Sequence, residues 1–163
     1  PARIRARERV PVFSVMASAS LTRRVTFAAA HRYRRPEWDD ARNAATFGAC
    51  AHPNYHGHSY VCHVTVRGDV DETTGFAVDL GLLDRILHEE VRVRFDHRNL
   101  NLDVAEFADG AQIPTSENLA RLVATRVQAR LGEALGEWAP EVTRVTVAED
   151  ETLSVTFEPA RDG

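Results

Sequence analysis

Two segments of this 163-residue chain alternate apolar and polar side chains, and this period restricts the fold most strongly. In residues 21–30 the apolar side chains include Val25 and Phe27, and they recur at every second position. That period predicts a strand, which is expected to end at His31. Residues 56–69 predict a second strand. A long polar stretch joins the two strands, and long loops in compact domains are usually functional or disordered.

The rest of the chain predicts two helices followed by two strands. Apolar residues fall at helical spacing in the first helix, and Thr115 provides an N-cap for the second. Gly132 and Gly136 are expected to end that second helix. The two helices are predicted over residues 80–94 and 116–131. The two strands are predicted over 142–149 and 152–158, with a tight turn near Asp150. The order ββααββ predicts an α+β fold, a four-stranded antiparallel sheet with two helices on one face.

Composition excludes several classes of protein. A hydrophobic fraction of 44% and a charged fraction of 27% are ordinary for a soluble globular protein, and no apolar run approaches the roughly 20 residues of a membrane span. The net charge of -4 argues against a nucleic-acid binder, although a small anionic substrate remains possible. With only two cysteines a disulfide scaffold is not expected, and a reducing cytoplasm is the expected location.

We expect a single domain over residues 20–159. Residues 1–19 carry several arginines and no clear periodicity, so they are expected to form a poorly ordered arm. Alternatively, the biological start is Met16, the only methionine. A basic arm that binds a partner is a third and less favoured interpretation.

Three histidines have the spacing of a metal site. His56 and His58 are two apart on a strand, so they project from the same face, and His31 would lie opposite them if the two strands form a hairpin. Three neutral imidazoles suit zinc, and a three-ligand zinc keeps one position open for water or substrate. The alternative is a chance cluster of surface histidines. We expect His63 and His88 to be ordinary, since one lies on the other strand face and one on a helix; the role of His52 stays open.

Four other residues are candidates for chemistry. Cys50 lies in a polar loop beside the histidines, where a thiol can be activated, whereas Cys62 lies within a strand and is expected to pack in the core. Asp96 can orient His97 and raise its basicity. Glu149 places an acid at the end of an apolar strand. Considered one at a time, Cys50, the Asp96–His97 pair and Glu149 could equally be ordinary loop or turn residues.

Taken together, the segments FAAAHR, FGACAHPNYHGHSY, TGFAVDL, LDRI, FDHRNLN, PTSENLA and VTVAED resemble the 6-pyruvoyltetrahydropterin synthase family, which includes 6-carboxytetrahydropterin synthase of the queuosine pathway. They occur in the family's order and cover nearly the whole domain. The resemblance implies the tunnelling fold and a homohexamer, a dimer of trimers with sites between subunits. It also implies roles for ten residues: zinc ligands His31, His56 and His58; catalytic residues Cys50, Asp96 and His97; and pterin-binding residues Glu149, Thr115, Ser116 and Glu117.

The resemblance further implies a reaction. The family's substrate is 7,8-dihydroneopterin triphosphate, from which triphosphate is eliminated to give 6-pyruvoyltetrahydropterin, with zinc and without a nicotinamide or flavin. Six positions separate Cys50 from His56, which we associate with the pyruvoyl-forming branch. The carboxy-forming branch, acting on the same substrate, is the alternative product assignment. A zinc- or pterin-binding module without catalysis is the third alternative, and the joint presence of Cys50, the Asp96–His97 pair and Glu149 argues against it.

Overall fold

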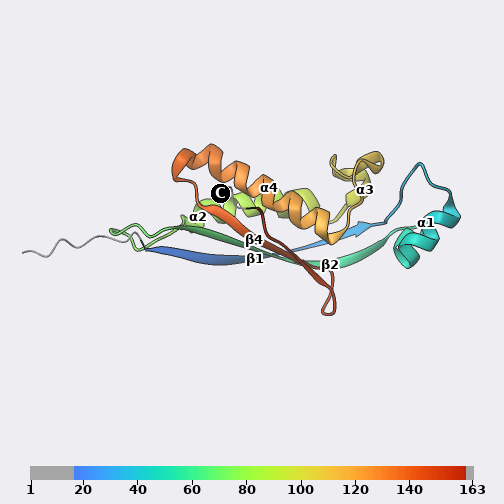
Figure 1. The fold of residues 1–163 in the computed structure, drawn as a ribbon, viewed down its shortest axis with the longest axis horizontal. Coiled ribbons are helices and arrows are strands. Elements are labelled where there is room, and N and C mark those ends of the chain that lie inside the picture. The colour runs from blue at the N-terminus through green and yellow to red at the C-terminus, as the bar shows by residue number, and fades with distance from the viewer. Residues whose placement is uncertain (1–16, 161–163) are drawn as a thin grey trace, which may run out of the picture.

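The computed structural model describes residues 17–160, except for the side chain of Asp109. Its central element is a long antiparallel hairpin of β1 (Ser18–His31) and β2 (His56–Asp69), which begins with Ser18 opposite Asp69 and ends with His31 opposite His56. β4 (Glu141–Ala148) pairs antiparallel with β2, and β5 (Ser154–Phe157) pairs with β4. The hairpin is the longest part of the sheet and runs the length of the molecule (Figure 1).

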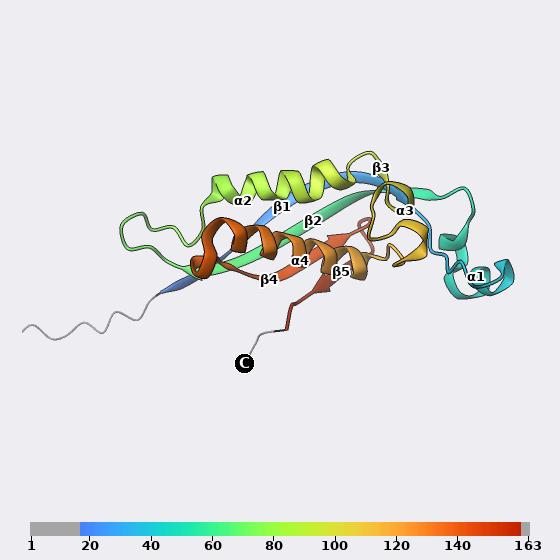
Figure 2. The same ribbon diagram turned by 90° about the horizontal axis from the view of Figure 1, so that it is seen from above.

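Two long helices cover one face of this sheet. α2 (Leu80–Leu87) continues into a π-helical turn (His88–Val93), and α4 (Ser116–Leu135) runs beside it. Figure 1 shows both helices above the strands, and Figure 2 shows them side by side. Their buried apolar residues pack against the sheet in one core, in which the largest fully buried side chains include Tyr60, Phe95, Phe107, Leu83, Ile86 and Leu119. Burial of one apolar face of each helix therefore fixes the two layers.

The α+β class and the two covering helices agree with the sequence-based prediction, but the sheet does not have four strands. It has five, in the order β3-β1-β2-β4-β5, because the two-residue β3 (Arg98–Asn99) pairs in parallel with β1. The chain reaches that edge after α2, from the core side of the sheet. A two-residue strand is too short for an alternating pattern to reveal it.

The two long polar segments also contain short elements that were not predicted. Between β1 and β2 lie α1 (Asp40–Phe47) and a 3₁₀ turn (Gly48–Ala51), and after β3 come α3 (Leu100–Asp103) and a second 3₁₀ turn (Ala108–Gly110). Asp39 caps α1 by accepting a hydrogen bond from the Arg42 N–H.

The expectation of an arm over residues 1–19 falls largely outside the described residues. Ser18 and Ala19 do not belong to an arm, since both pair with β2 in the hairpin. Across residues 17–160, none of the helices combines the length and apolar character that crossing a bilayer requires.

Candidate functional site

The three histidines meet at one end of the hairpin. The register places His31 directly opposite His56 and Ala29 opposite His58, so all three imidazoles project from the same face, as predicted. One ring nitrogen from each lies within 4.8 Å of the others. Between the two β2 histidines, Gly57 permits the close approach of the strands, because a Cβ there would lie 3.3 Å from the Ala29 carbonyl oxygen.

Hydrogen bonds orient the His31 ring toward this cluster. His31 is fully buried, and its Nδ1 lies 2.9 Å from the Pro114 carbonyl oxygen, to which it can donate only as an N–H. Its Nε2 then carries a lone pair and faces His56 Nε2 at 3.0 Å. Burial lowers the pKa of His31 to about 4, and burial followed by the charge of His58 lowers the pKa of His56. Both rings are therefore neutral at physiological pH, which is the form that binds metals.

The donor set fits a metal ion. Among the described residues, His56 Nδ1 and His58 Nε2 are buried side-chain atoms without a hydrogen-bond partner, and buried polar atoms are normally satisfied. Two neutral ring nitrogens 3.0 Å apart also need a proton or a cation between them. Three converging imidazoles match the ligand set of an open zinc site.

Glu149 lies beside the histidines because it directly follows β4, which pairs with β2. Ala148 pairs with Val61, so the next residue, Glu149, continues on the face that carries Tyr60 and His58. Its side chain is only 6% exposed, and its Oε2 lies 3.7 Å from His58 Nε2. The turn after β4 closes when the Glu149 N–H donates to the Leu153 carbonyl. Glu149 is thus a buried acid at a candidate metal site, not a solvated turn residue.

Residues 114–116, at the start of α4, contact both His31 and Glu149. Pro114 supplies the carbonyl that orients His31, and Ser116 Oγ donates to Glu149 Oε1 at 2.7 Å. Thr115 caps the helix by accepting from the Asn118 N–H at 3.3 Å, as predicted. Glu117 is exposed in the first turn of the helix. Of the three predicted pterin-binding residues in this segment, Ser116 is the one in direct contact with Glu149.

Cys50 is in the 3₁₀ turn that precedes the histidine pair. Its carbonyl accepts a hydrogen bond from the Tyr33 N–H at 2.7 Å, which ties this turn to the segment after β1. Burial, and then the negative charge of Glu149, raise the pKa of the half-buried Cys50 thiol. Cys62, by contrast, is fully buried within β2, as predicted.

Asp96 and His97 form a separate cluster at the edge of the sheet. His97 Nδ1 lies 3.2 Å from Asp96 Oδ1, and the His97 side chain is 84% exposed. A hydrogen bond from the Ala28 N–H, with further support from Arg92 and His97, lowers the pKa of Asp96, although desolvation opposes it. Within residues 17–160, no hydrogen bond or ion pair found in the structure connects this pair to Cys50 or to the three histidines.

Comparison with known proteins identifies the family. The family model described as 6-pyruvoyl tetrahydropterin synthase matches residues 20–160. The chain belongs to the 6-pyruvoyl tetrahydropterin synthase family. It is therefore an enzyme, a lyase of the pterin synthase kind.

Individual relatives of this pterin synthase support the same family assignment. The 6-pyruvoyl tetrahydrobiopterin synthase of Pongo abelii is 40% identical over 102 residues, which cover 63% of this chain and 69% of that protein. The 6-carboxy-5,6,7,8-tetrahydropterin synthase of Bacillus subtilis is 33% identical over 118 residues, 71% of this chain and 75% of that protein. The solved structure of Caenorhabditis elegans 6-pyruvoyl tetrahydropterin synthase superposes with a TM-score of 0.78 at 32% identity, covering 89% of this chain and 98% of that one.

Two tyrosines of this pterin synthase contact the candidate site but were not predicted from the sequence. Tyr60 lies 3.2 Å from His31 Nδ1 through its hydroxyl, and its position two residues after His58 could have revealed it. Tyr33 donates to Glu149 Oε1 at 3.2 Å and contacts the His31 ring edge-on, with centroids 5.0 Å apart. It lies in an irregular segment, where no periodicity shows which way a side chain points. Burial, and then Glu149, raise the pKa of Tyr33, so its phenol stays protonated and can only donate to the carboxylate.

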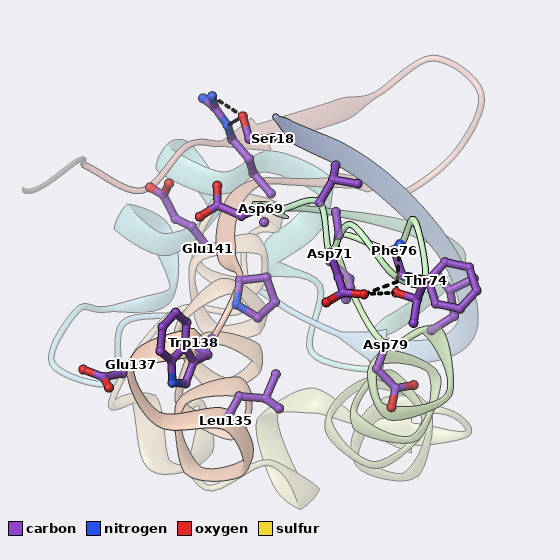
Figure 3. Close-up of a pocket in the computed structure, with 18 of the residues that line it drawn as sticks. Ser18, Asp69, Asp71, Thr74, Phe76, Asp79, Leu135, Glu137, Trp138 and Glu141 are labelled. Atoms are coloured by element: carbon purple, nitrogen blue, oxygen red, sulfur yellow. Dashed lines mark hydrogen bonds between the residues drawn. The ribbon is translucent and has the colours of Figure 1, made fainter. Parts of the chain in front are cut away.

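A groove of this pterin synthase lies at the opposite end of the hairpin. Ser18, Asp69, Phe76 and Trp138 are among its lining residues (Figure 3). At about 3.3 Å per residue, the 14-residue β1 separates it from His31 by roughly 40 Å. None of the candidate site residues lines it. The remaining histidines are also outside the cluster: His52 is exposed in the loop, His63 lies on the other face of β2, and His88 is exposed on the π-helical turn.

Proposed function

We propose that this chain is a zinc-dependent 6-pyruvoyltetrahydropterin synthase that acts on 7,8-dihydroneopterin triphosphate and eliminates triphosphate. The observation that carries the proposal is the convergence of three histidines with a buried carboxylate that accepts hydrogen bonds from two hydroxyls. The histidines and the acid come from both hairpin strands and the end of β4, so the fold itself assembles them. The domain that performs the reaction is proposed to extend over residues 20–159.

His31, His56 and His58 would hold the zinc, each through one ring nitrogen. When bound, zinc would supply Lewis-acid polarisation of substrate oxygens and a positive charge that favours the thiolate of a nearby cysteine. The Pro114 carbonyl keeps the His31 proton on Nδ1 and leaves Nε2 available. Such outer contacts commonly fix the tautomer of a metal ligand.

Glu149 is proposed to bind the pterin ring through the ring's adjacent amine and N–H donors. A buried carboxylate can accept both, and charge-assisted pairs of this kind orient a ligand as well as bind it. Ser116 holds the carboxylate by donating to Oε1 at 2.7 Å. Thr115 and Glu117 flank Ser116 at the start of α4 and complete the proposed pterin-binding segment.

Cys50 and His97 are the proposed proton carriers, and Asp96 orients the His97 ring. The reaction needs protons removed from the side-chain carbons and returned to the ring while triphosphate leaves. The two-electron reduction of the dihydropterin ring is balanced by oxidation of the hydroxyl carbon next to the ring, and oxidation of the second hydroxyl carbon is balanced by reduction of the terminal carbon to a methyl group as triphosphate leaves. Without other influences the Cys50 thiol stays protonated at neutral pH, because its pKa is raised. In that form it can donate a proton, and it must lose the proton before it can act as a base.

We propose that the complete site lies between subunits of a homohexamer, a dimer of trimers. The position of His97 supports this, because its side chain is 84% exposed at the edge of the sheet. A partner subunit could then bring its own Cys50 loop against this edge. Co-expression of Cys50→Ala and His97→Ala chains tests the arrangement. A shared site predicts recovery of up to about a quarter of wild-type activity, because random mixing leaves that fraction of sites intact; a site built within one chain predicts no recovery.

Mass spectrometry of the product tests the reaction itself. The zinc-loaded protein is incubated with 7,8-dihydroneopterin triphosphate, and formation of 6-pyruvoyltetrahydropterin with triphosphate supports the proposal. The alternative product is 6-carboxytetrahydropterin, favoured by the similarity to the Bacillus subtilis 6-carboxy-5,6,7,8-tetrahydropterin synthase. The six-position spacing from Cys50 to His56 favours the pyruvoyl product. The two free cysteines suit the reducing cytoplasm proposed as the location.

A further inference from the structure

The two oxygens of Glu149 have unequal surroundings. Oε1 accepts two hydrogen bonds, from Ser116 Oγ at 2.7 Å and from the Tyr33 hydroxyl at 3.2 Å. Among residues 17–160 no hydrogen bond to Oε2 is found, and His58 Nε2 lies 3.7 Å from it, which is too far for a hydrogen bond. One oxygen of the carboxylate is thus occupied by two donors while the other remains open.

This asymmetry conflicts with the way a pterin would bind. Each carboxylate oxygen offers about two lone-pair positions in its plane, so Ser116 and Tyr33 together occupy those of Oε1. A ring edge with two parallel donors needs one lone pair from each oxygen, as in other bidentate pairs. One of the two hydroxyls must therefore leave Oε1 when such a ligand binds.

Tyr33 is the hydroxyl that can leave. Its hydrogen bond is the longer by 0.5 Å, and its side chain is half-buried in an irregular segment after β1. Ser116 is 3% exposed and lies in the first turn of α4. A half-buried phenol can reach water after displacement, whereas a buried serine cannot.

We propose that the Tyr33 hydroxyl occupies the pterin position on Glu149 Oε1 in the free protein and gives way to the ligand's ring donor. Tyr33 then competes with the ligand and lowers the affinity of the site. The inference rests on the proposed function, because it requires that Glu149 receive the pterin edge. The cost falls on ligands with two adjacent donors, since a ligand with one donor can use Oε2 and leave Tyr33 in place.

Tyr33→Phe tests the competition while keeping the ring. The phenyl group preserves the edge contacts with His31 and Phe47, whose ring centroids lie 5.0 and 6.0 Å from that of Tyr33. The probe is 7,8-dihydroneopterin, which lacks the triphosphate, titrated into zinc-loaded protein. Because one net hydrogen bond no longer has to be broken, we expect binding about two- to tenfold tighter. Tyr55→Phe is the matched control: it removes a phenol near the site that does not contact Glu149, and its affinity should equal that of wild type.

A double-mutant cycle with Glu149→Gln separates the possible outcomes. If Glu149→Gln weakens binding and Tyr33→Phe tightens it only when Glu149 is present, the competition is established. Weaker binding by Tyr33→Phe would show that the hydroxyl positions Glu149 for the ligand, and unchanged binding would show that it never competes; either result overturns the inference and leaves the proposed pterin site intact. If Glu149→Gln itself has no effect on affinity, the proposed pterin anchor fails first.

Discussion

Replacement of Glu149 by glutamine probes the proposed pterin anchor, and the structure dictates how the new side chain must lie. Ser116 and Tyr33 both donate toward the position of Oε1, at 2.7 and 3.2 Å. The amide oxygen of Gln will therefore take that position, because an NH₂ group there would face two donors. The NH₂ group is then forced into the position of Oε2, where the ligand's second donor is expected.

The penalty follows from the loss of one acceptor in a buried place. Glu149 is 6% exposed, so water cannot easily rescue the mismatch. An unsatisfied donor pair in such a site costs roughly 1–3 kcal/mol. Affinity for a pterin without triphosphate should thus fall about ten- to a hundredfold.

The assay is a calorimetric or fluorescence titration with 7,8-dihydroneopterin, so that phosphate contacts cannot mask the loss. Glu151→Gln is the control, since Glu151 is an exposed acid two residues further along the same turn. Zinc content is measured for both variants and should remain that of wild type, because the three histidines are untouched. Equal affinities for wild type and Glu149→Gln would refute the anchoring role.

Three further predictions concern the metal, the thiol and the folded state. His56→Ala should lose most of its zinc after dialysis against a weak chelator, as read by metal analysis, whereas His63→Ala, on the other face of β2, should keep it. Full occupancy in His56→Ala would contradict the ligand assignment. Cys50→Ala should lower kcat about a hundredfold or more with zinc retained; Cys62→Ala should keep kcat and lose stability on the order of 1 kcal/mol, and equal losses of kcat would contradict the division. Glu90 is 4% exposed and binds Arg126 and Arg130 at 2.5 and 2.7 Å. Burial alone would raise its pKa, but these hydrogen bonds lower it. The resulting stabilisation is complete above the ordinary pKa of about 4.3 and disappears as the pH falls through the lowered value. Denaturant unfolding should show Glu90→Gln weakened by about 1–3 kcal/mol at pH 7 and converging on wild type as the pH falls through the lowered pKa of Glu90, with half-exposed Glu89→Gln much less affected; a pH-independent difference would contradict the charge argument.

The long elements of the fold could be predicted because their side chains report burial directly. β2 has the same bounds in the sequence-based prediction and in the structure, since every second residue from Tyr60 to Val66 is buried. The helix expected over 80–94 matches α2 and its π-helical extension. β3 could not be predicted, since its pairing with β1 depends on where α2 ends in space. Non-local placement decides such a short strand, and local propensity carries no signal for it.

The candidate site could likewise be predicted only in part from the sequence. The same-face placement of His31, His56 and His58 could be derived from strand period and hairpin pairing alone. Tyr33 and the Pro114 carbonyl could not, because both lie in irregular segments whose directions are set by tertiary contacts. The hydrogen bond between Ser116 and Glu149 likewise joins the start of α4 to the residue after β4, two residues that are 33 positions apart in sequence. Sequence pattern thus identified the three converging histidines, whereas the residues that orient them required the structure.

Backbone strain marks the remaining difference between local preference and observed structure. Tyr55 and His97 are non-glycine residues with φ near 60° and 58°, a region that costs on the order of 1–3 kcal/mol for such residues. Tyr55 immediately precedes His56, and the Arg32 guanidinium lies over its ring at 4.9 Å. His97 is held because its N–H donates to the Ala28 carbonyl at 2.6 Å while Asp96 accepts from the Ala28 N–H at 2.8 Å. Two hydrogen bonds to Ala28 of β1 thus impose on His97 a conformation that the local sequence does not favour. The two strained residues each lie at a group of candidate site residues, Tyr55 beside the histidines and His97 in the Asp96–His97 pair, where departures from local preference are expected.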